Sequence, residues 1–245
     1  MRPLVGAWRL ARVLTHVLHG LTIVLLRFPA RGATARHASI QWWSAKLLRL
    51  LGLSLHAHGL PRAGAKLLVS NHVSWLDIAA IHAVIPEARF VSKADVKHWP
   101  LVGRLVAGAG TLFIEREKKR DALRVVHQMA AALRAGDTVA VFPEGTTGDG
   151  HAVLPFHANL LQAAIATETP VQPVVLRYFD RQCAVSPVAE YVGETSLVDS
   201  LWRIACAAGL AIEVRVLLPQ GTAHADRRAL AEHLRQTIAQ QLPPA

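Results

Sequence analysis

The pattern of apolar and polar positions changes near residue 66, where short apolar runs begin to alternate with longer amphipathic stretches. Short runs predict strands, and apolar residues spaced three to four positions apart predict helices. The predicted strands lie near residues 66–70, 88–92, 111–114, 138–142, 171–177 and 211–217. The predicted helices lie near residues 75–85, 118–135, 157–168, 196–208 and 223–241. This alternation predicts an α/β fold, with a layered mixed sheet flanked by helices, in one domain at residues 59–245.

Residues 1–58 have a different pattern, with two apolar helical stretches separated by a Pro-Gly breaker. The first, Leu4–Leu26, is interrupted by two arginines and two histidines, so it falls short of the roughly 20 clean apolar residues that a spanning helix needs. The second, Ile40–Leu53, places tryptophans beside basic residues, which is typical of the headgroup level of a membrane. Together the two stretches predict an N-terminal membrane-associated helical hairpin that enters one leaflet.

Each stretch also has a second interpretation. Leu4–Leu26 fits a signal peptide, although its histidines interrupt the apolar part and nothing downstream is typical of a secreted protein. Ile40–Leu53 fits an ordinary helix packed on the domain.

Composition and charge narrow the class of partner. The 245 residues are 52% hydrophobic and carry a net charge of +10, so the chain can bury a substantial core and favours an anionic partner. A mean hydropathy of +0.28 favours a membrane lipid surface over nucleic acid. The two cysteines, Cys183 and Cys206, form no disulfide framework or metal site and indicate a reducing compartment. We therefore expect a protein at the cytoplasmic face of the inner (plasma) membrane, with no nucleic-acid partner and no metal.

A histidine and a carboxylate stand where the first predicted strand gives way to a helix. His72 and Asp77 are five residues apart, so they could not meet if both were helical. If Ser74 is the N-cap, His72 lies in the entering turn, from which its ring can fold back to Asp77. The carboxylate would then accept the Nδ1 proton and leave Nε2 free as a base. The same residues also fit a plain capping box, in which Asp77 serves only backbone donors.

Two more polar residues follow other predicted strands. Arg116 comes after the third strand and Glu144 after the fourth. Because ligands bind beyond the carboxyl ends of strands in open α/β sheets, a base, a cation and a carboxylate are expected at one edge of the sheet.

The residues at these strand ends resemble the glycerolipid acyltransferases of the lysophosphatidate acyltransferase type. The resemblance covers about residues 60–180 and rests on ordered motifs at family-like spacing. These are Asn71-His72-x-Ser74-x-x-Asp77, Ser92-Lys93, Pro100-x-x-Gly103, Gly110-x-x-Phe113-Ile114-x-Arg116, Phe142-Pro143-Glu144-Gly145-Thr146 and Val171-Gln172-Pro173-Val174.

The resemblance implies an acyltransferase in which His72 takes the proton from an acceptor hydroxyl as it attacks an acyl thioester, while Asp77 steadies the imidazolium. A positioned base of this kind contributes about 10²–10⁴ in rate. No cofactor is implied, and acyl-CoA or acyl carrier protein would be the co-substrate. Direct attack needs no serine nucleophile, and the chain lacks a Gly-x-Ser-x-Gly elbow. The substrate-binding residues implied by the motifs are Asn71, Ser74, Lys93, Arg116, Glu144, Gly145 and Thr146.

The acceptor implied first is the lysolipid 1-acylglycerol-3-phosphate, which would give phosphatidate. The chain departs from the family where Thr147-Gly148-Asp149-Gly150 replaces a common arginine, and where Phe156-His157 replaces a common Phe-Lys. With two fixed cations fewer, a lyso-ornithine lipid stays an alternative acceptor. An alternative of another class is a non-catalytic membrane lipid-binding protein, which would need only the hairpin and the basic charge.

Overall fold

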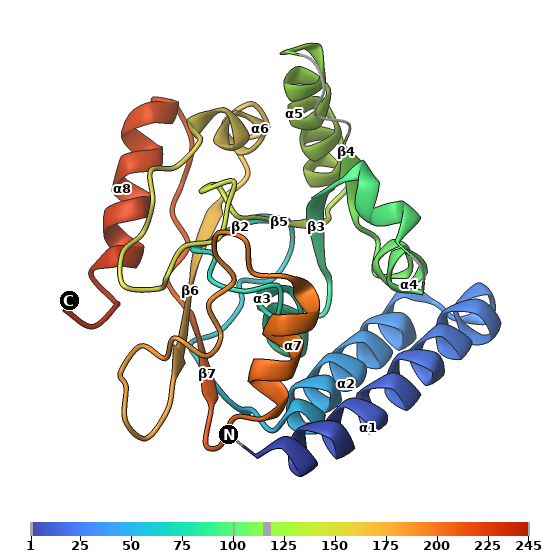
Figure 1. Cartoon of the computed structure of the whole chain (residues 1–245). Coiled ribbons are helices and arrows are strands. Elements are labelled where there is room, and N and C mark those ends of the chain that lie inside the picture. Colours follow the sequence, from blue (N-terminus) through green and yellow to red (C-terminus); the bar gives the residue numbers. More distant parts are fainter. Residues whose placement is uncertain (1, 100, 115–118, 245) are drawn as a thin grey trace.

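The protein forms a seven-stranded sheet covered by helices (Figure 1). The structure is a computed structural model that describes residues 2–99, 101–114 and 119–244. The strands are β1 (Ser54–His58), β2 (Lys66–Ser70), β3 (Ala88–Lys93), β4 (Leu112–Ile114), β5 (Thr138–Val141), β6 (Val171–Phe179) and β7 (Ala211–Val216). The longer helices are α1 (Pro3–Thr22), α2 (Ala33–Leu51), α3 (Asp77–Val84), α4 (Val102–Gly108), α5 (Lys119–Arg134), α7 (Leu197–Ala205) and α8 (Arg227–Ala239). Shorter helical segments are η1 (Ile23–Arg27), η2 (Phe28–Ala30), η3 (Ala94–His98), η4 (Ala158–Leu161) and α6 (Gln162–Ile165).

The sheet is mixed, with strand order β1-β7-β6-β2-β5-β3-β4. The strands β6, β2, β5, β3 and β4 run parallel to their neighbours in this series, whereas β7 runs antiparallel to β6. The carboxyl ends of the five parallel strands therefore share one edge, as the sequence predicted.

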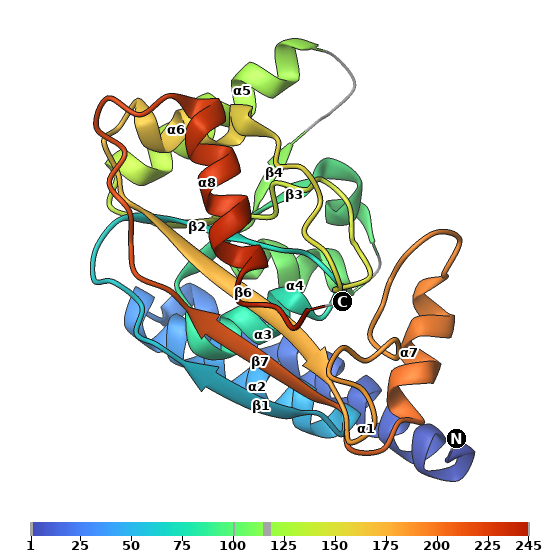
Figure 2. The same ribbon diagram turned by 90° about the vertical axis from the view of Figure 1, so that its left-hand side faces the viewer.

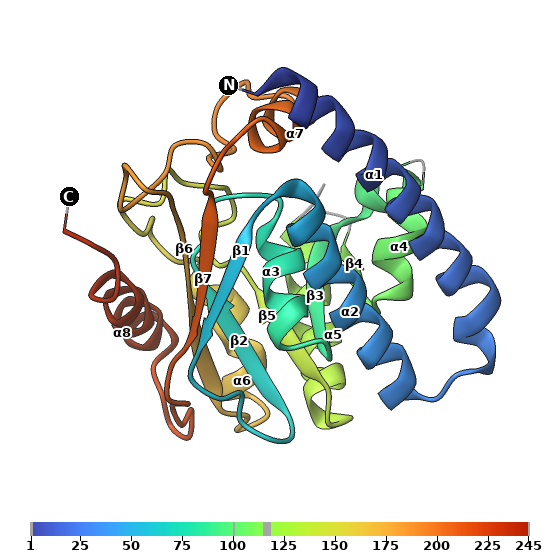
Figure 3. The ribbon, with the colours of Figure 1, turned by 90° about the horizontal axis from the view of Figure 1, so that it is seen from below.

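Two apolar layers cover the sheet, one on each face. Along β2, Leu68 packs into the cluster that includes α2 and α3, while Leu67 and Val69 pack into the cluster that includes α5 and α8. This alternation follows from the period of two in a strand. Seen from below, the sheet separates α8 from α1 and α2 (Figure 3). Because β2 is buried on both faces, the loop that follows it has a rigid base.

The α/β fold class is confirmed, and the six predicted strands are all present within a few residues of their predicted bounds. The structure adds β1, which pairs in parallel with β7, and the helix α4, neither of which was predicted. The predicted helix at 157–168 is a 3-10 turn, η4, followed by the single turn α6. The proposed division at residues 58 and 59 stays a prediction, and the strand just before it belongs to the sheet.

The N-terminal stretches form the predicted helical hairpin, in which α1 packs against α2 (Figure 2). The His16 ring stacks on Trp43 at 5.0 Å, and the Trp43 indole N–H donates to the His16 carbonyl at 3.1 Å. The expectation that the arginines and histidines leave the first stretch short of a spanning helix is not borne out by its length and composition. Its helical segments run without a break from Pro3 to Ala30 and contain an 18-residue window with a mean hydropathy of 1.5. By these two criteria alone the helix could cross a membrane, and 28% of that window is buried within the protein.

A buried histidine in α3 makes the stability of the protein depend on pH. His82 is 5% exposed, its Nε2 lies 2.9 Å from the Ala88 carbonyl oxygen, and burial lowers its pKa from 6.5 to about 4. Below pH 6.5 the His82 side chain of the unfolded protein binds a proton. In the folded protein the same side chain binds a proton only near pH 4. The free energy of unfolding should therefore fall across that window, by about 3 kcal/mol at most, and stay unaffected by His82 above it.

The variant His82→Gln, whose amide can still donate to Ala88, tests this dependence. We expect its melting temperature to drop less than that of the wild type between pH 7.5 and pH 4.5, measured by circular dichroism in detergent. Equal drops would show that His82 has no part in the effect.

Candidate active site

The loop after β2 carries His72 to the edge where the parallel strands end. The His72 ring stacks on Phe142, which follows β5, with centroids 4.0 Å apart and planes at 10°. Phe142 in turn stacks on Phe90 of β3 at 5.6 Å. The His72 side chain is 20% exposed, and a face of its ring is packed on Phe142.

The predicted contact between His72 and Asp77 is present. His72 Nδ1 lies 2.7 Å from Asp77 Oδ2, and Asp77 is fully buried. A carboxylate can only accept here, so the ring donates through Nδ1 and its Nε2 keeps a lone pair. This is the geometry of a base whose orientation is set by an acid.

The turn before α3 differs from the predicted cap. The helix begins at Asp77, Leu76 is its N-cap, and no side chain caps it. Ser74 is fully buried, and its hydroxyl has no hydrogen-bond partner among the described residues. The carboxylate of Asp77 itself accepts from the backbone N–H groups of Val73 and Ser74, at 2.7 and 3.0 Å. One oxygen of Asp77, Oδ2, therefore binds both the backbone of the turn and the histidine ring.

Tyr178, near the end of β6, is a site residue that the sequence analysis missed. Its hydroxyl donates to Asp77 Oδ1 at 2.7 Å, and the side chain is 1% exposed. Burial and the neighbouring Asp77 charge raise the pKa of Tyr178 well above its usual value, so it stays a donor. The available signal was a tyrosine in a largely apolar buried strand, but its partner lies 101 residues away.

Glu144 holds two loops of the site together. Its Oε1 accepts from the His72 backbone N–H at 2.7 Å, and its Oε2 accepts from that of Leu154 at 2.8 Å. Burial raises the pKa of this carboxyl, which is 5% exposed. Gly145 follows with φ +72°, a conformation that favours glycine, and a Cβ there would press on the His157 ring at 3.0 Å.

The other predicted binding residues are spread over the same edge. Asn71 is 2% exposed, and its amide makes two hydrogen bonds of 2.9 Å to the Leu176 backbone, so it holds β2 to β6. Thr146 is exposed beside Gly145. Lys93 ends β3 at this edge, but its side chain and the whole of Arg116 lie outside the described residues. The substrate-binding roles of all these residues stay predictions.

The sequence comparison decides the family. The acyltransferase family model matches residues 54–177, which is half of the chain and includes His72, Asp77 and Glu144. The chain belongs to the acyltransferase family.

Named relatives of this acyltransferase act on lysolipids. The lyso-ornithine lipid O-acyltransferase of Pseudomonas aeruginosa is 34% identical over 94% of this chain and 90% of its own length. The 1-acyl-sn-glycerol-3-phosphate acyltransferase of Neisseria gonorrhoeae is 35% identical over 77% of this chain and 73% of its own. The crystal structure of the 1-acyl-sn-glycerophosphate acyltransferase PlsC from Thermotoga maritima shares the fold, with a TM-score of 0.67 at 19% identity and 96% of both chains covered.

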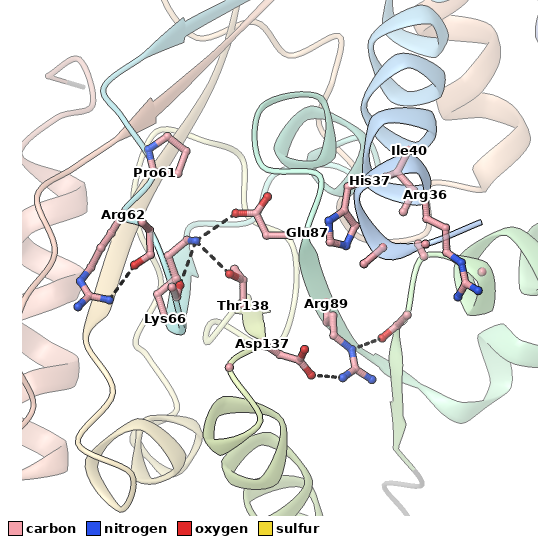
Figure 4. Close-up of a pocket in the computed structure, with 18 of the residues that line it drawn as sticks. Arg36, His37, Ile40, Pro61, Arg62, Lys66, Glu87, Arg89, Asp137 and Thr138 are labelled. Carbon is pink, nitrogen blue, oxygen red and sulfur yellow. Dashed lines mark hydrogen bonds and ion pairs between the residues drawn. The ribbon is translucent and has the colours of Figure 1, made fainter. Parts of the chain in front are cut away.

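A cavity of 730 Å³ lies at the opposite edge of the sheet, where β2, β3 and β5 begin (Figure 4). Its buried Lys66 pairs with Glu87 at 3.1 Å, and its Arg89 pairs with Asp137. These cations are already neutralised, and the whole length of the strands separates them from His72. The cavity is therefore not part of the acyltransferase site. Among the described residues, no group of three or more His, Cys, Asp or Glu side chains could hold a metal ion.

Removing the Glu144 charge should loosen the loop of the acyltransferase that carries His72. In Glu144→Gln the new amide N–H₂ faces one of two backbone donors, so a buried N–H loses its acceptor at a cost of about 1–3 kcal/mol. We expect a lower melting temperature and slower turnover. Glu194→Gln, at an exposed position, is the matched control, and equal melting curves for the two variants would contradict the prediction.

Proposed function

We propose that this acyltransferase moves a fatty acyl group from an acyl thioester to the free hydroxyl of a lysolipid, with His72 as the general base. The observation that carries the proposal is the 2.7 Å contact between His72 Nδ1 and the buried Asp77, combined with a partly exposed ring. This pair can accept a proton from a hydroxyl and stabilise the resulting imidazolium.

The reaction needs no covalent enzyme intermediate. His72 Nε2 takes the proton as the acceptor oxygen bonds to the thioester carbonyl carbon. When the tetrahedral intermediate collapses, the carbon–sulfur bond breaks and the sulfur leaves with its electron pair. The imidazolium then returns the proton to the thiolate, so the base is regenerated for the next cycle.

Lysophosphatidate is the first acceptor that we propose, with phosphatidate as product. The Neisseria gonorrhoeae relative carries the name of that activity at 35% identity. The donor would be acyl-CoA or acyl carrier protein, and no cofactor would be needed.

A lyso-ornithine lipid is the second candidate. The Pseudomonas aeruginosa relative, which aligns over 94% of this chain, bears that activity in its name. In addition, the loop after Glu144 presents an exposed Asp149 instead of a cation, which suits the amine of an ornithine head group better than a phosphate.

The substrates are membrane lipids, and the N-terminal hairpin supports a membrane location. Exposed apolar residues follow one side of α1, including Leu4, Trp8, Leu14 and Leu18. We propose that this hairpin binds the cytoplasmic face of the inner membrane.

A thiol-release assay tests the function and chooses between the acceptors. Purified protein in mixed micelles would receive acyl-CoA or acyl carrier protein donor, with either lysophosphatidate or lyso-ornithine lipid. We expect thiol release that requires one acceptor, together with the acylated product by mass spectrometry. If thiol release is no faster than in buffer for every pair of donor and acceptor, the alternative class, a non-catalytic lipid-binding protein, would be favoured.

A further inference from the structure

The cavity at the edge where β2, β3 and β5 begin has a surplus of positive charge. Its walls carry five Lys and Arg side chains but only two carboxylates, Glu87 and Asp137. Glu87 is already paired with the buried Lys66. Asp137 is already paired with Arg89. The cations that remain are Arg31, Arg36 and Arg62, and a concave site with unneutralised cations favours an anionic ligand.

The three remaining arginines hydrogen-bond only to neutral oxygens among the described residues. Arg31 donates to the Ser39 hydroxyl at 2.8 Å, and Arg36 donates to the Arg31 carbonyl at 2.8 Å. Arg62 donates to two carbonyls of its own loop, at 3.0 and 3.2 Å. None of the three forms an ion pair within the described part of the chain. Their guanidinium groups are therefore positioned by the fold while their charges stay uncompensated.

The shape of the cavity indicates how large its ligand is. Figure 4 shows Arg62 at one end and Arg36 at the other, with the two ion pairs between them. The volume of 730 Å³ lies within the usual range of small-molecule sites, about 300–1,000 Å³. The planar fork of an arginine binds phosphate oxygens in pairs. Arginines at both ends of such a cavity therefore suit a ligand with more than one phosphate group.

Four segments of the chain meet at this cavity, namely the start of α2, the loop before β2, the end of α4 and the turn before β5. The walls are open where these segments carry glycines. A Cβ on Gly32 or Gly136 would meet no atom within 4 Å, and one on Gly64 would meet only Arg62, at 3.9 Å. A ligand in the cavity would therefore contact the N-terminal hairpin and the sheet together.

We propose that this cavity is a second ligand site of the acyltransferase, which binds an anion with at least two phosphate groups. Such groups occur in soluble organic phosphates and in the head groups of some anionic lipids, and basic pockets beside membrane helices bind lipids of that kind. The site lies at the opposite edge of the sheet from His72. None of the tests below uses acyl transfer, so they stand even if the proposed function fails.

The melting temperature of the full chain in neutral-detergent micelles tests for binding. Sodium pyrophosphate is the probe for a soluble ligand, and cardiolipin mixed into the micelles is the probe for a lipid. We expect at least one of them to raise the melting temperature to a plateau, because a ligand that binds only the folded protein stabilises it. The references are sodium chloride at equal ionic strength and phosphatidylcholine in the micelles. If neither probe exceeds its reference, the proposal is wrong.

The variant Gly32→Asp places a carboxylate in the cavity wall without disturbing the fold. Gly32 is the N-cap of α2 with φ −69°, so an aspartate fits this backbone and caps the helix. Without a probe its melting temperature should equal or exceed that of the wild type. Its affinity for the probe should fall about tenfold, because a negative charge now faces the phosphate groups. Gly32→Asn caps without a charge and should keep the wild-type affinity, so equal affinities of the two variants would overturn the proposal.

Arg36→Gln and Arg49→Gln form a second matched pair. Both arginines are exposed on α2, but only Arg36 lines the cavity. Each variant loses one positive charge, so unspecific attraction of anions to the hairpin is reduced equally. Arg36→Gln should bind the probe about tenfold more weakly than Arg49→Gln, because it loses a charge-assisted hydrogen bond. The same affinity in both would show that the anion binds outside the cavity and would refute the proposal.

Discussion

Replacing His72 with alanine is expected to lower acyl transfer by about 10²- to 10⁴-fold, the usual contribution of a positioned base. The reason lies in the contacts of the ring, which is stacked on Phe142, hydrogen-bonded to Asp77 and still 20% exposed. Without it, the acceptor hydroxyl must lose its proton to water. The measurement is the initial rate of thiol release at saturating lysolipid.

Vesicle binding of the same variant is the control. It should equal that of the wild type, since His72 lies in the loop after β2 and the proposed membrane-binding element is the N-terminal hairpin. Equal turnover in His72→Ala and the wild type would exclude the mechanism. Loss of both turnover and vesicle binding would point to misfolding, which circular dichroism would detect.

Asp77→Asn should reduce turnover by a factor on the order of 10²–10⁴ as well, with the acceptor KM nearly unchanged. The carboxylate accepts from the His72 ring, two backbone N–H groups and the Tyr178 hydroxyl. An asparagine can turn its oxygen to the first three donors and its nitrogen to the Tyr178 oxygen. The fold and the orientation of the ring should survive, whereas the negative charge that stabilises the imidazolium is lost.

The companion variant Tyr178→Phe separates charge from positioning. It keeps the Asp77 charge but removes the donor to Oδ1, so a smaller loss of turnover, about tenfold, is expected together with a lower melting temperature. If Asp77→Asn turned over at the native rate, Asp77 would be a turn-forming residue only. If Tyr178→Phe fell as far as Asp77→Asn, the hydrogen bond would matter more than the charge.

The sequence predicted those parts of the site that depend on short spacing. The five-residue spacing from His72 to Asp77, at the end of a strand, allowed the ring-to-carboxylate contact to be predicted beside a plain helix cap, and that contact is present. The order of strands and helices likewise predicted a common edge for His72 and Glu144. Both predictions rest on the spacing of residues and elements along the chain, which can be read from a single sequence.

Contacts between distant segments could not be predicted in this way. The partner of Tyr178, the two backbone donors of Glu144 and the position of Asn71 between β2 and β6 all depend on which strands are neighbours in the sheet. Nothing in the local pattern of Ser54–His58 specifies a partner strand, so β1 was missed. Ser74 was assigned a cap because its position fits one, but the Asp77 carboxylate already satisfies the backbone donors of that turn.

The long sequence separations within the site affect when the site can fold during synthesis of the chain. The links from Asp77 to Tyr178 and from Asn71 to Leu176 join segments 101 and 105 residues apart, and such non-local parallel pairings form slowly. The apolar N-terminal helix leaves the ribosome well before β6 is synthesised. If the N-terminal hairpin binds the membrane as proposed, a nascent chain would therefore reach the bilayer before Tyr178 is available to hold Asp77 and its histidine.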